Sequence, residues 1–408
     1  MALRHLPVRP NADQLKHQAK ELLQGIRNGD PEALAEFQAS HPAPPAPDQA
    51  RLTDAQRALA RSYGVSSWPR LALACQLIDA IWNEDVETVR RLILRHPRLR
   101  DEDARGVRGN WGPPLSHAAT AGKFAVVRLL RELGAQDVQY AFDRASMKGH
   151  LEIARYLQSA GAHIQKGVVM GPCEALNGVG LRFLLELGAD LSDDQGDPLA
   201  PVGMVLETYS RNPPEKHDCL EAMASHGLAL PDTAPMALHR GRIDLLERHL
   251  KNDPELLGRT FPHEAIYPPS LGCHTDHSLA LHGTPIAGGT LLHLAVDFDE
   301  YEMAHWLLNR GAAVDARAEI DADGFGGHTA LFGCVVSQSY RTNCRRDDAF
   351  ARLLLDHGAD RSILASLRKR LRFVEDETEH FYRNVTPLEW GRRFHDPSWV
   401  NPAVMALL

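Results

Sequence analysis

Residues 289–315, GTLLHLAVDFDEYEMAHWLLNRGAAVD, decide the fold of this chain. The stretch contains two short apolar runs, at 291–295 and 303–308, whose apolar residues recur every three or four positions. Such spacing is typical of amphipathic α-helices. An acidic pair interrupts the pattern between the runs, and Gly311 supplies the left-handed residue that often ends a helix. Neither helix can bury its apolar face alone, so the pair must stack on further pairs.

Similar helix pairs recur along the chain, with Gly-Ala or a related ending at each close. Three of these endings, at Gly134, Gly161 and Gly188, follow one another in two steps of 27 residues. The pattern Thr-x-x-His-x-Ala, a second helix and Gly-Ala resembles the ankyrin repeat. The resemblance covers residues 71–408 and implies an all-α ankyrin-repeat solenoid of about eight helix pairs. The steps are shorter than a full ankyrin unit of about 33 residues, which indicates trimmed hairpins.

The first 70 residues predict a helical cap rather than a repeat. Residues 11–40 read as a helical hairpin, and a proline-rich linker leads to another helix. The sequence DAQRALARSYGVSSWPRL, residues 54–71, resembles the amino-terminal segment of some bacterial ankyrin proteins. A repeat array needs such an end piece with a polar outer face.

These patterns divide the chain into segments of different character. We expect a helical cap at 1–70, a first block of repeats at 71–259 and a histidine-rich insert at 260–288. A second block follows at 289–408 and carries its own insert at 361–385. This second insert has a basic run followed by an acidic run, which predicts a salt-bridged surface segment.

Composition excludes several classes of protein. The net charge is −8, which gives no electrostatic case for nucleic-acid binding. No apolar run approaches the length of a membrane span, and the first 20 residues lack the apolar core of a signal peptide. The six cysteines form no Cys-x-x-Cys pair, as expected for free thiols in a reducing compartment. We therefore expect a cytoplasmic protein that binds neither membranes nor nucleic acid.

The first insert concentrates histidines. Five of the 21 histidines lie between residues 263 and 293, near a cysteine and an aspartate, and such groups suit a divalent transition metal. The spacing matches no established metal motif, and the alternative is a loop folded back on the array. His293 stands at the repeat's own Thr-x-x-His position, where the resemblance implies a structural brace. The candidate metal ligands are His274, Asp276, His277 and His282.

An acidic stretch at 321–323 precedes the next repeat. Asp321 and Asp323 hint at a calcium loop, but Phe332 stands where the closing glutamate would be required. The ankyrin resemblance instead places these residues in a hairpin, with His328 facing a concave groove. The same resemblance implies a mixed groove built from hairpins and from the exposed ends of first helices. Its candidate residues are Trp111, Asp143, Lys148, Glu174, Asp297, Phe298, Asp321, Asp323, His328 and Phe394.

Two functions from different classes fit the sequence. The first is a protein-binding scaffold that uses its concave groove and inserts and needs no cofactor. The alternative is an enzyme in which the insert at 260–288 closes a pocket over a small polar substrate, with acid–base or metal-assisted chemistry. Its candidate catalytic residues are Glu264, Asp276, His277 and His328. The chain has no Gly-x-Ser-x-Gly, phosphate-loop or dinucleotide motif.

Overall fold

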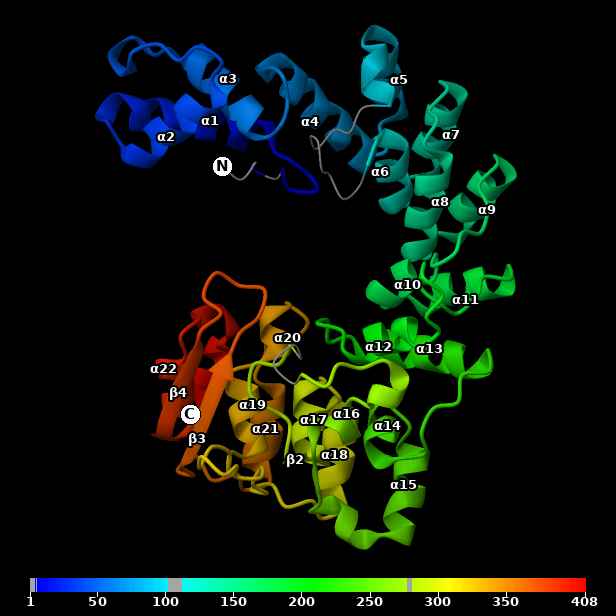
Figure 1. Cartoon of the computed structure of the whole chain (residues 1–408), viewed down its shortest axis with the longest axis vertical. Coiled ribbons are helices and arrows are strands. Elements are labelled where there is room, and N and C mark those ends of the chain that lie inside the picture. Colours follow the sequence, from blue (N-terminus) through cyan, green and yellow to red (C-terminus); the bar gives the residue numbers. More distant parts are fainter. Residues whose placement is uncertain (1–3, 5, 102–111, 277–280) are drawn as a thin grey trace. The chain divides into compact units, whose positions relative to one another are not determined.

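The computed structural model describes residues 4, 6–101, 112–276 and 281–408 (Figure 1). Contacts divide the chain into two compact units, Met1–Ile164 and Gln165–Leu408. Both units are mostly helical and stack helix pairs in series, as the repeat pattern predicts. The division falls inside the predicted first block 71–259, so the predicted limits of the cap and blocks stay predictions. In the described part of the chain, no helix has both the length and the apolar character needed to cross a membrane.

The first unit opens with the predicted helical hairpin. Asn11 caps α1 by accepting hydrogen bonds from two backbone amides, and Asp30 caps α2, whose first residue is Pro31. The apolar faces of these helices share one core with α3 and with Leu71 and Cys75 of α4. The segment therefore covers the end of the first repeat pair. Its helices are α1 (Ala12–Asn28), α2 (Pro31–Ser40), η1 (Pro47–Gln49) and α3 (Leu52–Ser62).

Three helix pairs follow in this unit. The first helices, α4, α6 and α8, contact one another in order, and so do the second helices α5, α7 and α9. This serial contact buries a face that no single pair could bury. The bounds are α4 (Trp68–Trp82), α5 (Val86–Arg95), η2 (Pro97–Arg100), α6 (Pro114–Thr120), α7 (Phe124–Glu132), α8 (Val138–Met147) and α9 (Leu151–Ser159).

The second unit repeats the same stacking. Contacts run from α10 to α12, from α14 to α17, from α17 to α19 and from α19 to α22. Figure 1 shows these helices side by side. The early pairs are α10 (Met170–Glu174), α11 (Gly178–Glu186), α12 (Ala200–Leu206), α13 (Pro213–Ser225), α14 (Ala234–His239) and α15 (Ile243–Asn252), followed by η3 (Pro254–Leu257). The later helices are α17 (Leu291–Asp297), α18 (Tyr301–Asn309), α19 (Ala330–Val335), α20 (Gln338–Arg341), α21 (Ala349–Asp356), α22 (Pro387–Arg393), η6 (Pro397–Trp399) and α23 (Pro402–Leu407).

The first insert folds back on the array, one of the two outcomes that the sequence allows. Its strand β1 (Thr260–Phe261) pairs antiparallel with β2 (Gly289–Thr290), and α16 (His263–Ile266) and η4 (Pro269–Leu271) lie between them. The buried hydroxyl of Thr284 donates to the carbonyls of Phe332 and Val336 and accepts from Trp390 Nε1 at 3.1 Å. The insert is thereby fixed to two successive first helices.

The second insert is a β-hairpin, which the sequence did not lead us to expect. Its strands β3 (Ala365–Arg370) and β4 (Glu379–Val385) pair antiparallel. Leu367 and Tyr382 are buried on one face, and Arg368 and Phe381 lie opposite each other on the other. The segment is salt-bridged as predicted, but Arg368 contacts Asp321 and Asp323, at 2.7 and 3.0 Å, instead of the nearby acidic run. Charged residues on one face had hidden the period of two that marks a strand.

Residues 318–328, which we call the finger, join this hairpin to the array. The finger meets β3 at Gly326, whose amide donates to the Ser366 carbonyl at 2.6 Å. Gly326 has a φ of 124°, and a Cβ there would overlap the carbonyl oxygen of Glu319. By contrast, Gly358 has a φ of 88° with no atom close to where its Cβ would be.

We expect Gly326→Ala to destabilise the second unit more than Gly358→Ala. The second substitution adds only left-handed backbone strain, of about 1 kcal/mol, whereas the first adds a backbone clash that must move the finger. Urea unfolding, followed by hydrogen exchange of peptides from α17 and α19, measures both. Equal losses for the two variants would contradict the close packing of the finger.

Candidate functional site

A buried polar network joins the first insert to the array. His282 of the insert donates from Nδ1 to Asp297 Oδ2 at 2.7 Å and accepts at Nε2 from the Tyr267 hydroxyl at 3.0 Å. Arg211 donates to the same Oδ2 at 2.9 Å and to the Leu281 carbonyl at 2.8 Å. The side chains of Arg211 and Asp297 are only 2% and 6% exposed. Each charge therefore depends on its partner for compensation.

The pKa values in this network follow from burial and from its charges. Burial alone would raise the pKa of Asp297, but His282 and Arg211 outweigh it and lower that pKa to about 2. Burial lowers the pKa of His282 to about 4, although Asp297 opposes the shift. At neutral pH the network consists of one ion pair and a neutral imidazole whose two nitrogens are both hydrogen-bonded.

Three residues expected at an exposed groove are buried instead. Asp297 belongs to the network, and Phe298 lies beside it with the Lys216 ammonium 4.2 Å from its ring centroid. Phe394 packs edge-on against Trp390 at a centroid distance of 4.9 Å. The prediction of exposure was wrong for all three. For Asp297 and Phe298 the reason is that residues of the first insert, His282 and Tyr267, cover the end of this first helix.

His293 and His328 form hydrogen bonds with backbone groups and lack the properties of a catalytic pair. His293 accepts from the Thr290 amide and donates to the carbonyl of His328, which confirms its predicted structural role. His328 is 2% exposed and donates from Nε2 to the Pro285 carbonyl at 2.8 Å, so it does not face an open groove. Burial lowers the pKa of His328 to about 3. Such a low pKa makes it a poor base near neutral pH.

A cavity of about 630 Å³ lies between the insert, the finger and β3. We call it the insert cavity. Asp276, His282 and His328 all line it, so three residues of the predicted enclosed pocket share one cavity. Asp321 of the finger lines it as well, and so does Lys369 of β3, which the sequence did not single out.

The other candidate metal and catalytic residues are scattered. His274 pairs with Glu207 at 2.7 Å, while His282 is held in the Asp297 network. Glu264 is exposed on α16 and does not line the cavity. His277 lies outside the described residues. Within the described ranges, no three His, Cys, Asp or Glu side chains gather as a metal site would require.

The remaining groove candidates differ in exposure and in their partners. Asp321 and Asp323 are exposed and paired with Arg368. Lys148 is exposed at the C-cap of α8, and Glu174 is exposed at the end of α10. Asp143 is half-buried in α8 of the first unit, where its carboxylate accepts from Gln139. Burial raises the pKa of Asp143 to about 6. Trp111 lies outside the described residues.

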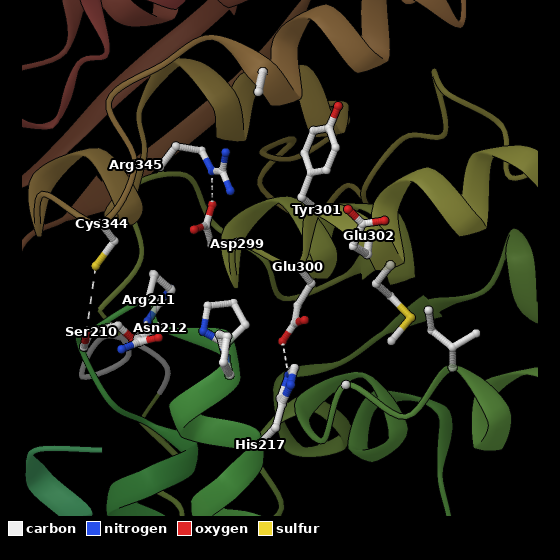
Figure 2. A pocket seen from close by; sticks show the side chains of 16 residues that line it. Ser210, Arg211, Asn212, His217, Asp299, Glu300, Tyr301, Glu302, Cys344 and Arg345 are labelled. Atoms are coloured by element: carbon white, nitrogen blue, oxygen red, sulfur yellow. Dashed lines mark hydrogen bonds and ion pairs between the residues drawn. The ribbon is translucent and has the colours of Figure 1, made fainter. Parts of the chain in front are cut away.

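A second hollow follows the turns between the first and second helices of four successive pairs (Figure 2). We call it the turn groove, and its volume is about 970 Å³. It is built where α13, α15, α18 and α21 begin. Its lining residues are Ser210, Arg211, Asn212, Pro213, Pro214, His217, Gly241, Ile243, Asp299, Glu300, Tyr301, Glu302, Met303, Cys344, Arg345 and Ala349.

A hydrogen bond and an ion pair connect the walls of the turn groove. His217 and Glu300 meet at 2.7 Å between α13 and α18, and Asp299 meets Arg345 at 2.5 Å ahead of α21 (Figure 2). Asp299 has a φ of 65°, an unusual conformation for a residue other than glycine, which shapes the tight turn. Burial raises the pKa of Asp299, and Arg345 opposes the shift.

The sequence patterns do not single out these groove residues. The Asp-Glu pair at 299–300 interrupts the helical pattern, and that interruption was its only apparent role. The turn between two helices recurs in each helix pair, and an acidic pair placed in such a turn is the signal that could have indicated Asp299 and Glu300. Their basic partners, His217 and Arg345, come from other helix pairs and show no pattern in the sequence.

Comparisons with known proteins agree with the repeat pattern. The family described as Ankyrin repeat matches residues 287–319. No curated protein matches the chain. The crystal structure of the human ASB11 ankyrin repeat domain is similar at 18% identity, covering 72% of this chain and 96% of that one. Its TM-score of 0.23 is too low for this superposition to carry any argument about the chain.

We expect Asp143→Asn to stabilise the first unit at pH 7. The raised pKa means that the folded state disfavours the charged carboxylate, a cost that is full above pH 6 and absent below pH 4. With allowance for solvent screening, the gain should be about 1–2 kcal/mol at pH 7 and should vanish near pH 4. Urea unfolding monitored by hydrogen exchange of α8 measures it. A gain that is independent of pH would contradict the assignment.

The second unit should lose stability as the pH falls from about 6.5 to 4. Burial lowers the pKa of His282 and His293 to about 4 and that of His328 to about 3, so the unfolded state binds their protons first. Each such imidazole adds about 1.4 kcal/mol per pH unit to the slope.

His293→Asn should reduce this slope by about one proton. The matched change His305→Asn, at an exposed histidine of the same unit, should leave the slope unchanged. Urea midpoints between pH 4 and 7, read from the exchange of α17 peptides, provide the measurement. Parallel slopes for the two variants would mean that His293 titrates normally in the folded protein.

Proposed function

We propose that this ankyrin repeat protein binds a partner protein and that the turn groove receives a segment of the partner. Ankyrin repeats generally serve as scaffolds for protein–protein interaction, which fits a chain built mainly from stacked pairs. The observation that carries the proposal is the continuous hollow across the turns of four successive pairs. A surface assembled from several repeats suits an extended polypeptide better than a compact ligand.

Preorganisation supports this surface. The His217–Glu300 contact joins α13 to the turn before α18, and the Asp299–Arg345 pair joins that turn to the segment before α21, before any partner arrives. The Arg345 guanidinium also lies over the rings of Tyr301 and Phe350, at 5.7 and 5.2 Å from their centroids. Because these groups are already ordered, binding would cost little additional conformational entropy.

The lining indicates the chemistry of the segment. Pro213, Pro214 and Ile243 supply apolar surface, and Glu302 is an exposed carboxylate without a hydrogen bond or ion pair to any described residue. The partner segment would therefore place a basic side chain near Glu302 and apolar side chains on the prolines.

The enzyme alternative gains no support from the candidate residues. Both nitrogens of His282 are occupied, and the pKa of His328 is far below neutrality. A general base works best with a pKa near the working pH. Neither histidine meets this condition.

Reversing the charge of Glu302 tests the proposal. The tagged protein is used to capture partners from its host, and each captured protein is then measured in purified form against Glu302→Arg. We expect the variant to lose affinity by about tenfold or more, since an attractive contact becomes repulsive.

Glu255→Arg is the matched control, because Glu255 is exposed in the same unit but does not line the groove. It should bind like the unmodified protein. If both variants retain full affinity for every partner, the turn groove is not the binding surface.

A further inference from the structure

We infer that the insert cavity is a binding site for a small zwitterion of the amino-acid type, held with its carboxylate at Lys369 and its ammonium at an acidic rim. The cavity is separate from the turn groove, so the inference does not depend on the proposed protein partner. It stands on the distribution of charge between the inner wall and the rim of the cavity.

The inner wall carries one uncompensated cation. Lys369 is half-buried in β3, and its ammonium makes no hydrogen bond or ion pair within the described part of the chain. Asp297 is the carboxylate whose charge acts on it, but that carboxylate already bonds Arg211 and His282. Burial lowers the pKa of Lys369 to about 8, which leaves it mostly protonated at pH 7. A half-buried ammonium without a partner is a position where a ligand anion gains an ion pair.

The strand explains why Lys369 points away from the neighbouring arginines. Side chains alternate between the two faces of β3, so Lys369 lies on the same face as Leu367. Leu367 is buried and pairs with Tyr382, and Lys369 pairs with His380. Arg368 lies on the other face and is occupied by Asp321 and Asp323. Arg370 donates to the Glu377 carbonyl. Among the basic residues of β3 that line the cavity, Lys369 is thus the half-buried one whose ammonium has no bond to any described residue.

Neutral imidazoles complete the inner wall. His328 lines the cavity, and because its Nε2 donates to Pro285, its Nδ1 is an acceptor. This Nδ1 is buried and has no partner among the described residues. His282 next to it is neutral, so neither ring adds a competing positive charge. The wall can accept one hydrogen bond and one anionic group.

The rim has the opposite charge. Four exposed acidic residues line it, against the two arginines of β3. They are Asp276, Glu319, Asp321 and Glu379. The acidic rim would repel a simple anion such as phosphate, and the Lys369 ammonium inside the cavity would repel a simple amine. A molecule with both charges satisfies both ends.

The size of the cavity agrees with such a ligand. Small-molecule sites usually measure about 300–1,000 Å³, and the insert cavity has about 630 Å³. Apolar surface from Ile286, Leu367 and Phe325 remains for the ligand's side chain. An amino acid with a large side chain fits this lining better than glycine.

The full-length protein is screened by thermal shift against the twenty protein amino acids, and each hit is titrated by calorimetry. We expect at least one hit that binds one molecule per chain. Its decarboxylated amine and its deaminated acid should each bind about tenfold or more weakly, because each lacks one of the two charges. Inorganic phosphate is the simple-anion probe and should bind no better than the deaminated acid.

Two substitutions at Lys369 separate charge from folding. Lys369→Met keeps an unbranched side chain but removes the charge, and it should lower the affinity for the amino acid found in the screen by about tenfold or more. Lys369→Arg keeps the charge and should retain most of the affinity. Lys251→Met, at an exposed lysine of the same unit, is the matched control and should change nothing.

Glu379→Lys tests the rim, because it should change the affinities of two ligands in opposite directions. The hit should bind more weakly to this variant, whereas its deaminated acid should bind more tightly, since the rim now attracts anions. The inference is overturned if no amino acid binds, if Lys369→Met leaves the affinity unchanged, or if phosphate or the deaminated acid binds the unmodified protein as well as the amino acid does.

Discussion

The buried contact between Arg211 and Asp297 is the interaction on which the second unit depends. It joins the turn before α13 to the end of α17, and His282 and Tyr267 attach the first insert to the same carboxylate. An ion pair withdrawn from water is stable only when every hydrogen-bonding position is filled. Arg211 meets this condition through the carbonyls of Thr208 and Leu281 and through both the backbone and the side chain of Asp297. The insert is therefore part of the unit's interior.

This interior lies between the two hollows. Arg211 lines the turn groove and His282 lines the insert cavity, and both contact Asp297. The turn groove is formed by elements that every repeat possesses, namely the turns between its helices. The insert cavity requires the insert and the β3–β4 hairpin, two segments outside the helix pairs, together with the finger. The first hollow thus belongs to the general scaffold, and the second is specific to this chain.

Burial also changes what the histidines can do. Their concentration between residues 263 and 293 suggested metal binding or acid–base chemistry. In the folded unit His293 braces a hairpin, His282 completes the buried network and His263 contacts the carbonyl of His274. Burial lowers the pKa of His282 and of His293, which favours the neutral form of both rings. A cluster of histidines in the sequence can therefore mark a polar interior.

The sequence by itself determined the stacked helix pairs, because apolar spacing and terminal glycines act over a few residues. It also indicated the folded-back insert and the structural role of His293. Only the tertiary structure decided that Asp297 and Phe298 are buried, that residues 365–385 form a hairpin and that Lys369 faces a cavity. The burial of Asp297 and Phe298 depends on Arg211, Tyr267 and His282, which come from other segments, and the place of Lys369 depends on which face of β3 is covered. No local pattern records such contacts.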